Sequence, residues 1–202
     1  MFIMRTVVIA SNRLIFVETE PAKNLFNVTD GVVKIFKTMA DGRRQVTGFL
    51  FPGDFLGLVD SESYAYSAET VTQAKLCQFP RKQLEALLLE LPNLEQRLLG
   101  MASHELVAAQ DQMVLLGRKS ARERVASFLL MLSKATGQQG HPANPIVVSM
   151  TRADVADYLG LTVETVSRSL SRLNSQHLIH LMDDKQVQLV DPAALSKIAV
   201  GI

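Results

Sequence analysis

Short runs of β-branched and aromatic residues dominate the first eighty residues, and turn-forming pairs such as Asp41-Gly42 and Pro52-Gly53 separate them. These runs predict short strands over residues 7–10, 13–17, 25–28, 32–36, 45–51 and 76–79. Because the strands are short and closely spaced, a small antiparallel barrel or roll fits them best. Strands do not alternate with helices, which argues against a Rossmann domain.

After Pro80 the spacing of apolar residues becomes helical. A short helix is expected over residues 81–89, and a longer one from Leu94 to Leu116. Apolar or small residues recur along the longer helix at steps of three and four, close to the coiled-coil repeat of about 3.5. They are Leu98, Ala102, Leu106, Ala109, Met113 and Leu116. We interpret this stripe as a dimer seam without charged residues, and packing against its own domain is the alternative.

The stretch from residue 150 to residue 190 has the order of a winged helix-turn-helix. A further amphipathic helix is expected before it, over residues 122–134. The capping-box sequence from Thr151 to Asp154 then predicts a helix start at about residue 152. Gly160 suits a tight turn, and Thr162 would cap a second helix over residues 163–176. Residues 178–179 and 187–189, on either side of a turn at 183–185, predict the two strands of a wing.

The second helix carries the chemistry of base recognition on one face. Val166, Leu170 and Leu173 would form its buried face, whereas Glu164, Ser167 and Arg168 project together from the opposite face. An arginine can donate two parallel hydrogen bonds to guanine, a glutamate can accept one from cytosine, and a serine can bond to either kind of base edge. A solvated face with a local Glu–Arg pair is the alternative reading of this triplet.

Composition and charge narrow the class of protein. The 202 residues are 48% apolar and 20% charged, with a net charge of +1, so neither disorder nor a strongly basic surface is indicated. Residues 118–202 hold ten basic and seven acidic residues, and this excess suggests that the C-terminal part meets a polyanion. No apolar run approaches a membrane span of about 20 residues. We interpret residues 1–10 as a buried strand rather than a signal peptide, and expect a soluble, cytoplasmic protein with no membrane partner.

The chain resembles the CRP/FNR superfamily of transcription regulators. The resemblance is carried by Thr151-Arg-Ala-Asp-Val-Ala-Asp-Tyr-Leu-Gly-Leu-Thr-Val-Glu-Thr-Val-Ser-Arg, and by Phe51-Pro-Gly-Asp-Phe-Leu-Gly in the strand-rich part. It implies an α+β fold with three parts. These are a β-roll like the cyclic-nucleotide-binding jelly roll over residues 1–92, a dimerisation helix over residues 93–117 and a winged helix-turn-helix over residues 118–202. It also implies that Glu164, Ser167 and Arg168 read TTGA and TCAA half-sites of a palindrome in double-stranded DNA.

Departures from the superfamily bear on the effector. Leu58 stands where its cyclic-nucleotide binders carry an acid, and Tyr66 stands where they carry an arginine, so we expect no cyclic nucleotide. The iron–sulfur members hold four cysteines, whereas this chain has only Cys77. Cys77 is either a redox-active thiol or a small buried residue of a strand. The best match is the FixK-like branch, and no cofactor is expected. The N-terminal cysteine segment of those members precedes the point where this sequence starts, and a truncated reading frame is one explanation.

The remaining expectations concern partners and alternatives. The protein should not be an enzyme, and it should contact RNA polymerase if it is an activator. The candidate phosphate contacts are Arg118, Lys119, Arg152, Thr162, Thr165, Arg172 and Lys185. A small-molecule or redox sensor in the β-roll is the second hypothesis, and a metal or enzyme site at His177 and His180 is the third. Met101, Met113 and Met131 are interpreted as core side chains rather than haem ligands.

Overall fold

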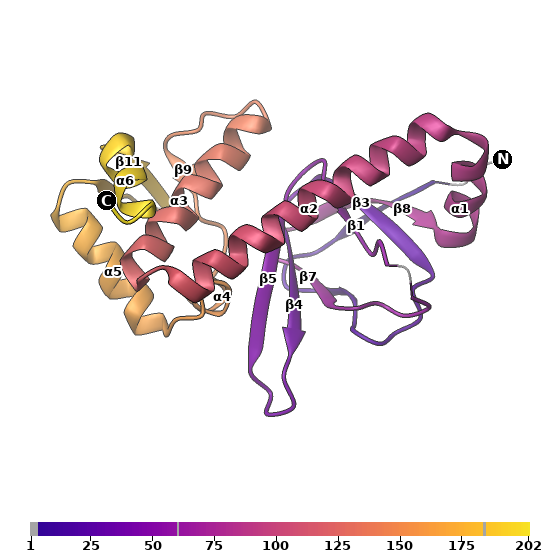
Figure 1. The fold of residues 1–202 in the computed structure, drawn as a ribbon, viewed down its shortest axis with the longest axis horizontal. Coiled ribbons are helices and arrows are strands. Elements are labelled where there is room, and N and C mark those ends of the chain that lie inside the picture. The colour runs from indigo at the N-terminus through magenta and orange to yellow at the C-terminus, as the bar shows by residue number, and fades with distance from the viewer. Residues whose placement is uncertain (1–3, 60, 184) are drawn as a thin grey trace. The chain divides into compact units, whose positions relative to one another are not determined.

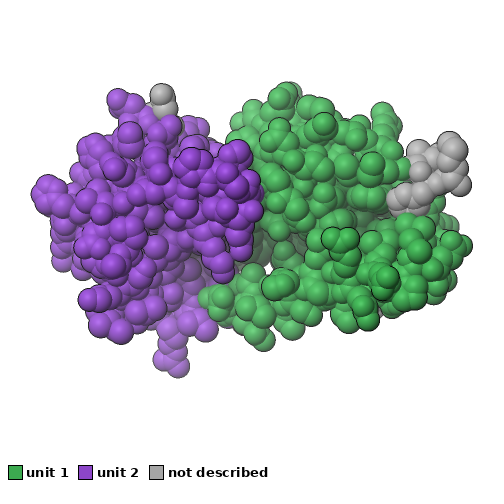
Figure 2. Space-filling view, turned by 90° about the horizontal axis from the view of Figure 1, so that it is seen from above, with its two compact units in different colours: residues 1–111 green, residues 112–202 purple. Residues whose placement is uncertain are grey.

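The computed structural model describes residues 4–59, 61–183 and 185–202. Within it the chain forms two compact units, residues 1–111 and residues 112–202 (Figure 2). The division falls inside the long helix α2, Pro92–Arg118, so that helix contributes to both units (Figure 1). The first three residues of the strand predicted over residues 1–10, and Asp184 of the predicted wing turn, lie outside the described residues.

Two four-stranded antiparallel sheets form most of the first unit. Their strand orders are β1-β8-β3-β6 and β2-β7-β4-β5. The strands are β1 Arg5–Ile9, β2 Leu14–Phe16, β3 Asn24–Asp30, β4 Val33–Thr38, β5 Arg44–Leu50, β6 Phe55–Leu56, β7 Ser67–Thr70 and β8 Ala74–Pro80. The predicted antiparallel roll is therefore confirmed.

The roll encloses an apolar core rich in aromatic rings. Phe16 stacks on Tyr64 with 3.7 Å between ring centroids, and the Phe26 ring stacks on Phe16 with 6.0 Å between centroids. Alternation along β3 sends Phe26 and Val28 into this core, while Leu25 packs on the other side of the sheet. The sheet that contains β3 thus packs on both faces, which explains why the adjacent residues Leu25 and Phe26 are both apolar and both buried.

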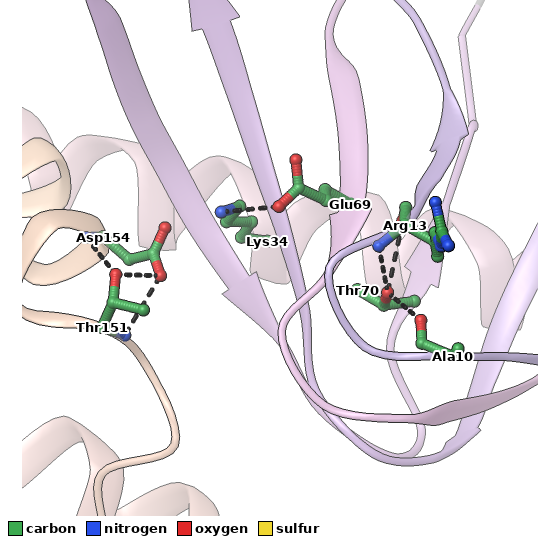
Figure 3. Close-up of polar contacts among 7 residues, drawn as sticks. All are labelled: Ala10, Arg13, Lys34, Glu69, Thr70, Thr151 and Asp154. Carbon is green, nitrogen blue, oxygen red and sulfur yellow. Dashed lines mark hydrogen bonds and ion pairs between the residues drawn. The ribbon is translucent and has the colours of Figure 1, made fainter.

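Buried polar groups in the roll are bonded within the roll (Figure 3). The Thr70 hydroxyl donates to the Ala10 carbonyl at 2.6 Å and accepts from the Arg13 backbone N–H at 3.0 Å. On neighbouring strands β4 and β7, Lys34 Nζ lies 2.9 Å from Glu69 Oε1. Such pairing is needed because an unsatisfied buried polar group costs about 1–3 kcal/mol.

Three details of the predicted roll were wrong. The short strands β6 and β7 were not predicted, since Phe55–Leu56 is brief and Ser67–Thr70 lacks a β-branched run. Their pairing comes from strands distant in sequence. The first strand is not buried either, because β1 is an edge strand and Val8 on it is 64% exposed.

Helix α2 follows the short helix α1, Arg81–Glu90, and corrects part of the predicted seam. Leu98 is buried against Leu25 and Leu84 within the first unit, so it does not belong to an exposed seam. By contrast, Leu106 is 60% and Met113 65% exposed. The exposed apolar residues of the helix are Leu99, Met101, Leu106, Val107, Met113 and Val114.

Two of the methionines interpreted as core side chains lie outside the core. Met113 is 65% and Met101 37% exposed on α2, and only Met131 on the next helix is half-buried. Met101 and Met113 lie on α2 whereas Met131 lies on α3, so the three residues do not share one helix, and spacing alone does not say which face of a helix is covered.

The second unit is a helical domain with a small antiparallel sheet. Its elements are α3 Ala121–Gln138, β9 Ile146–Val147, α4 Arg152–Leu159, α5 Val163–Ser175, β10 Ile179–Leu181, β11 Gln186–Leu189 and α6 Pro192–Ala199. The sheet order is β10-β11-β9, which confirms the predicted helix-turn-helix and wing and adds β9 to it. Helix α6 was also missed, although Asp191 as its N-cap and Pro192 as its first residue are a recognisable start signal.

No helix among the described residues is both long enough and apolar enough to cross a membrane.

Candidate nucleic-acid interface

The first helix of the motif begins at a complete capping box. Asp154 N–H donates to Thr151 Oγ1 at 3.0 Å, and Thr151 N–H donates to Asp154 Oδ2 at 3.1 Å (Figure 3). The Thr151 hydroxyl also donates to the same carboxylate oxygen at 2.6 Å. Two backbone donors at the start of α4 are thereby satisfied, which fixes where the helix starts. The predicted box, with aspartate in place of glutamate, is confirmed.

The turn between α4 and α5 has the predicted chemistry. Gly160 ends α4 in the left-handed conformation, with φ +60°, and its N–H donates to the Ala156 carbonyl. Thr162 then caps α5, because its hydroxyl accepts the Thr165 backbone N–H at 3.2 Å. This short turn determines the direction in which α5 leaves α4.

Helix α5 has one buried and one exposed face. Val166, Leu170 and Leu173 are at most 4% exposed and pack into the second unit. On the other side, the predicted base-reading residues Glu164, Ser167 and Arg168 are all exposed and one helical turn apart. The structure therefore brings the three side chains together on a free surface.

Glu164 is held in its charged form. Its pKa is lowered, first by a hydrogen bond from its own backbone N–H, then by the Thr162 hydroxyl, and to a smaller extent by the charge of Arg168. A glutamate is ionised at neutral pH in any case and can then only accept hydrogen bonds; the lowered pKa of Glu164 extends this range toward lower pH. Arg168 Nη2 lies 3.4 Å from Thr165 Oγ1, a long and weak contact for a guanidinium.

The candidate phosphate contacts fall into three groups. Arg152, at the start of α4, and Lys185, in the wing turn, line the same surface hollow and are both exposed. Thr162 and Thr165 lie together at the start of α5, with 3.1 Å between their hydroxyl oxygens. The others are Arg118 and Arg172, which are exposed, and Lys119, whose Nζ donates to Ser127 Oγ at 2.8 Å.

Two side chains that sequence analysis did not single out attach the last turns of α2 to the motif. Arg124 on α3 donates to backbone carbonyls of α2 and α4, and Gln112 on α2 donates to the Tyr158 carbonyl of α4 at 2.7 Å. Hydrogen bonds to carbonyls leave no sequence pattern. For Arg124, the available signal was a charged residue next to the buried residues Val125 and Phe128 of α3.

The roll carries the positions at which a nucleotide effector was considered. Leu58 is 43% exposed, and the Tyr66 hydroxyl accepts the Gly57 backbone N–H at 2.9 Å. Burial raises the pKa of Tyr66 above its usual value, so the phenol stays neutral. Neither side chain supplies a charge for a cyclic phosphate. Cys77 is partly buried on the central strand β8, opposite Asn27 of β3.

The two histidines near the wing were considered as metal ligands. His177 and His180 are both exposed, and His180 pairs with Gln188 across β10 and β11. Among residues 4–59, 61–183 and 185–202, no group of three or more His, Cys, Asp or Glu side chains is placed to hold a metal ion. Asp184, which was considered beside them, lies outside these residues.

Comparisons with known proteins agree with both halves of the structure. The Crp-like helix-turn-helix domain matches residues 123–198, and the cyclic nucleotide-binding domain matches residues 6–90. The nitrogen fixation regulation protein FixK of Azorhizobium caulinodans is 42% identical over 95% of this chain and 77% of its own length. The protein of the same name from Bradyrhizobium diazoefficiens is 38% identical over 98% of this chain and 83% of its own length.

A solved structure extends the similarity to the whole fold. FixK2 from Bradyrhizobium japonicum superposes with a TM-score of 0.90 at 35% sequence identity, covering 97% of each chain. The resemblance read from the helix-turn-helix residues is thereby confirmed over nearly the full length. The chain belongs to the CRP/FNR family of DNA-binding transcription regulators, and among that family's members it is similar to FixK.

Proposed function

We propose that the protein binds, as a homodimer, a palindrome with TTGA and TCAA half-sites, and that α5 of each subunit enters the major groove. The observation that carries this proposal is the exposed triplet Glu164, Ser167 and Arg168 on a helix whose opposite face is packed. A helix held in this way can present the same three side chains to successive base edges.

The triplet fits the one G·C pair that each half-site offers. Arg168 would donate to O6 and N7 of guanine, and Glu164 would accept from N4 of the cytosine paired with it. Ser167 lies between them on the same face and can bond to either kind of base edge. As an exposed, ionised carboxylate, Glu164 can only accept hydrogen bonds, which suits the amino group of cytosine.

Phosphate contacts would set the register of the helix in the groove. Arg152 and Lys185 line one hollow, and Thr162 and Thr165 lie at the positive end of α5. Arg118, Arg172 and Lys119 complete the proposed set, and Lys119 has further N–H donors besides the one bonded to Ser127. These residues would add affinity that falls with salt and carries little sequence information.

The exposed apolar residues of α2 support a dimer seam. Leu99, Leu106 and Met113 recur every seven residues and are all more than half exposed. Their spacing is that of a coiled-coil seam, and Val107 and Val114 run beside it. Of the predicted stripe, only Leu98 is replaced, by Leu99. The proposed seam keeps Ala102, Leu106, Ala109, Met113 and Leu116.

A second candidate is a small-molecule sensor in the roll that gates DNA binding. The match of residues 6–90 to the cyclic nucleotide-binding domain favours it. The uncharged Leu58 and the occupied Tyr66 hydroxyl favour the effector-independent form instead. We propose that form, with no cofactor, no enzymatic activity, a cytoplasmic location and a contact to RNA polymerase if the protein activates. Native mass spectrometry separates the two candidates, since the first predicts no bound ligand.

The direct test is fluorescence anisotropy of the purified protein, without added ligand, on a duplex with TTGA and TCAA half-sites. A scrambled duplex of the same length at the same salt is the control, because phosphate contacts alone give salt-dependent binding. Tight binding to the palindrome only is the expected result. Equal, weak binding to both duplexes would refute the proposed specificity.

A further inference from the structure

The guanidinium of Arg124 lies where two helices end. Its Nη2 donates to the Leu116 carbonyl in the last turn of α2 at 2.8 Å, and its Nη1 donates to the Leu159 carbonyl at the end of α4 at 2.8 Å. Its Nε donates to the Lys119 carbonyl at 2.9 Å, and Nη1 also lies 3.4 Å from the Gly160 carbonyl. One side chain thus bonds the ends of α2 and α4 and the segments that follow both.

The Leu116 and Leu159 carbonyls are among those that a helix leaves unpaired. The last four C=O groups of a helix have no partner within it, and together they carry a partial negative charge. A cation between two such ends is favoured by both helices at once. Arginine suits the place better than lysine, because its planar group holds five donors in fixed directions, whereas an ammonium is a compact point charge.

The same junction is closely packed on its other side. A side chain at Gly160 would place its Cβ 3.1 Å from Leu116 Cδ2 and 3.4 Å from Arg124 Nη1. Leu115 on α2 is 7% exposed, and Gln112 on α2 donates to the Tyr158 carbonyl at 2.7 Å. The last two turns of α2 are therefore bonded and packed onto the end of α4, within a single compact unit.

Because Gly160 leads directly into the capped start of α5, whatever fixes the end of α4 also fixes α5. We propose that Arg124 is a positioning residue that sets the direction of the recognition helix α5 relative to α2, and so sets the half-site spacing that the dimer accepts. The inference rests on the proposed function, since it assumes that α2 forms the dimer and α5 reads the bases. Arg124 itself contacts carbonyls rather than DNA, so its effect should fall on spacing and not on base preference.

The test compares dissociation constants for palindromes that differ only in spacer length. The duplexes carry the parent protein's preferred spacer, one base pair more and one base pair fewer, and a single half-site duplex is included. The parent should prefer one spacer by about tenfold or more, and Arg124→Lys should reduce that ratio to about threefold or less. Guanine preference at a single half-site should stay at the parent's value.

Two further variants keep the result interpretable. Lys134→Met removes an exposed charge from the same helix α3 and should leave the spacer profile unchanged. Arg124→Met removes every hydrogen bond of the group and should flatten the profile further, and if this variant does not fold, the lysine variant decides.

An unchanged spacer ratio in folded Arg124→Lys would overturn the inference. So would a parent that binds all three spacers equally, or a variant that loses base preference together with spacer preference. A parent that does not distinguish the palindrome from a scrambled duplex would instead refute the proposed function on which the inference rests.

Discussion

The roll and the helix-turn-helix both bond hydroxyl side chains to their own backbones, but they differ in the polar surface that is left over. In the roll, Tyr64 donates to the Asn24 carbonyl at 2.8 Å and Tyr66 accepts from Gly57, so the hydroxyls inside it serve its own backbone. In the second unit, the Thr151 and Thr162 hydroxyls do the same for the backbone at the starts of α4 and α5. The polar face of α5 is left free for another molecule. A recognition surface therefore needs a backbone whose own hydrogen bonds are made by other side chains.

The largest expected effect breaks the dimer rather than either unit. Leu106→Asp would place two like charges at the α2 seam, and burying them unpaired is strongly unfavourable. The dimer should be lost at micromolar concentration, and affinity for the palindrome should fall by about 100-fold or more, since the two half-sites no longer bind together. Sedimentation measures the first effect and anisotropy the second. A dimer that persists would show that the seam lies elsewhere.

The next largest effect comes from truncating one core leucine in each unit, and the two variants are compared for stability and for DNA recognition. Leu76 in the roll and Leu173 on α5 are both 0% exposed, and truncating either to alanine should cost about 2–5 kcal/mol of its unit's stability. Leu173→Ala should also impair DNA recognition, whereas Leu76→Ala should spare the guanine preference. Urea unfolding and anisotropy report the two effects. Equal loss of recognition in both variants would contradict the division of labour between the units.

Arg168→Ala tests the recognition face itself. Losing a bidentate contact to guanine should cost about 1–3 kcal/mol and relax specificity at that base pair. Arg172→Ala, an exposed arginine one turn along the same helix, is the control and should weaken binding to all sequences alike. A preference for guanine that survives in Arg168→Ala would remove this residue from the reading set.

The caps should have smaller effects that distinguish two helices of the second unit. Thr162→Ala and Ser120→Ala each remove an N-cap, which typically costs about 0.5–2 kcal/mol. Only Thr162 caps α5, so only its loss should also reduce discrimination between palindrome and scrambled duplex. Thermal unfolding and anisotropy on both variants check this. Equal losses of discrimination would mean that general stability, rather than the start of α5, governs recognition.

The smallest expected effects depend on pH and have opposite signs in the two units. Partial burial raises the pKa of Glu105, with the charge of Asp54 as a second cause, so its contribution to the roll is complete below the unfolded pKa and is lost as pH rises through the raised value. Hydrogen bonds with Ser120 lower the pKa of Glu123, so its contribution is present above the unfolded pKa and is lost as pH falls through the lowered value.

Glutamine variants of these two residues turn the signs into a measurement. Glu105→Gln should raise the melting temperature at pH 7, because it removes a carboxylate whose charged form is disfavoured by its surroundings in the folded protein. Glu123→Gln should lower the melting temperature, because it removes a carboxylate whose charged form is favoured by hydrogen bonds with Ser120. Both differences should shrink toward zero well below the unfolded glutamate pKa of about 4.3. Thermal unfolding at several pH values checks this, and changes of the same sign in both variants would contradict the assigned environments.

Sequence reasoning succeeded where the signals are local. The capping box at Thr151, the left-handed Gly160 and the apolar face of α5 each depend on residues within a few positions, and the structure confirms all three. It failed where structure depends on distant partners. Strand β7 has no strand-like composition and exists because β2 and β4 flank it, while Leu98 fits the helical stripe but is buried by Leu25 from the roll.

For the exposed residues, the sequence predicts which hydrogen bonds each side chain can make, but not whether the side chain is free to make them. Sequence placed Glu164 and Arg168 on one face, and geometry added that the face is free and that Glu164 is held as an acceptor. The bonds of Arg124 to helix-end carbonyls could not be anticipated, because any residue type supplies a carbonyl. Backbone acceptors become visible only once the fold brings two helix ends together.

The most direct test of base reading by α5 is a panel of palindromic duplexes, each with one base pair changed symmetrically, measured by anisotropy at fixed salt. Substitution of the G·C pair in each half-site should cause the largest loss, about 1–3 kcal/mol per site. Substitutions in the spacer should have little effect. Equal losses at every position, or none at the G·C pair, would contradict the claim that Glu164, Ser167 and Arg168 read the sequence.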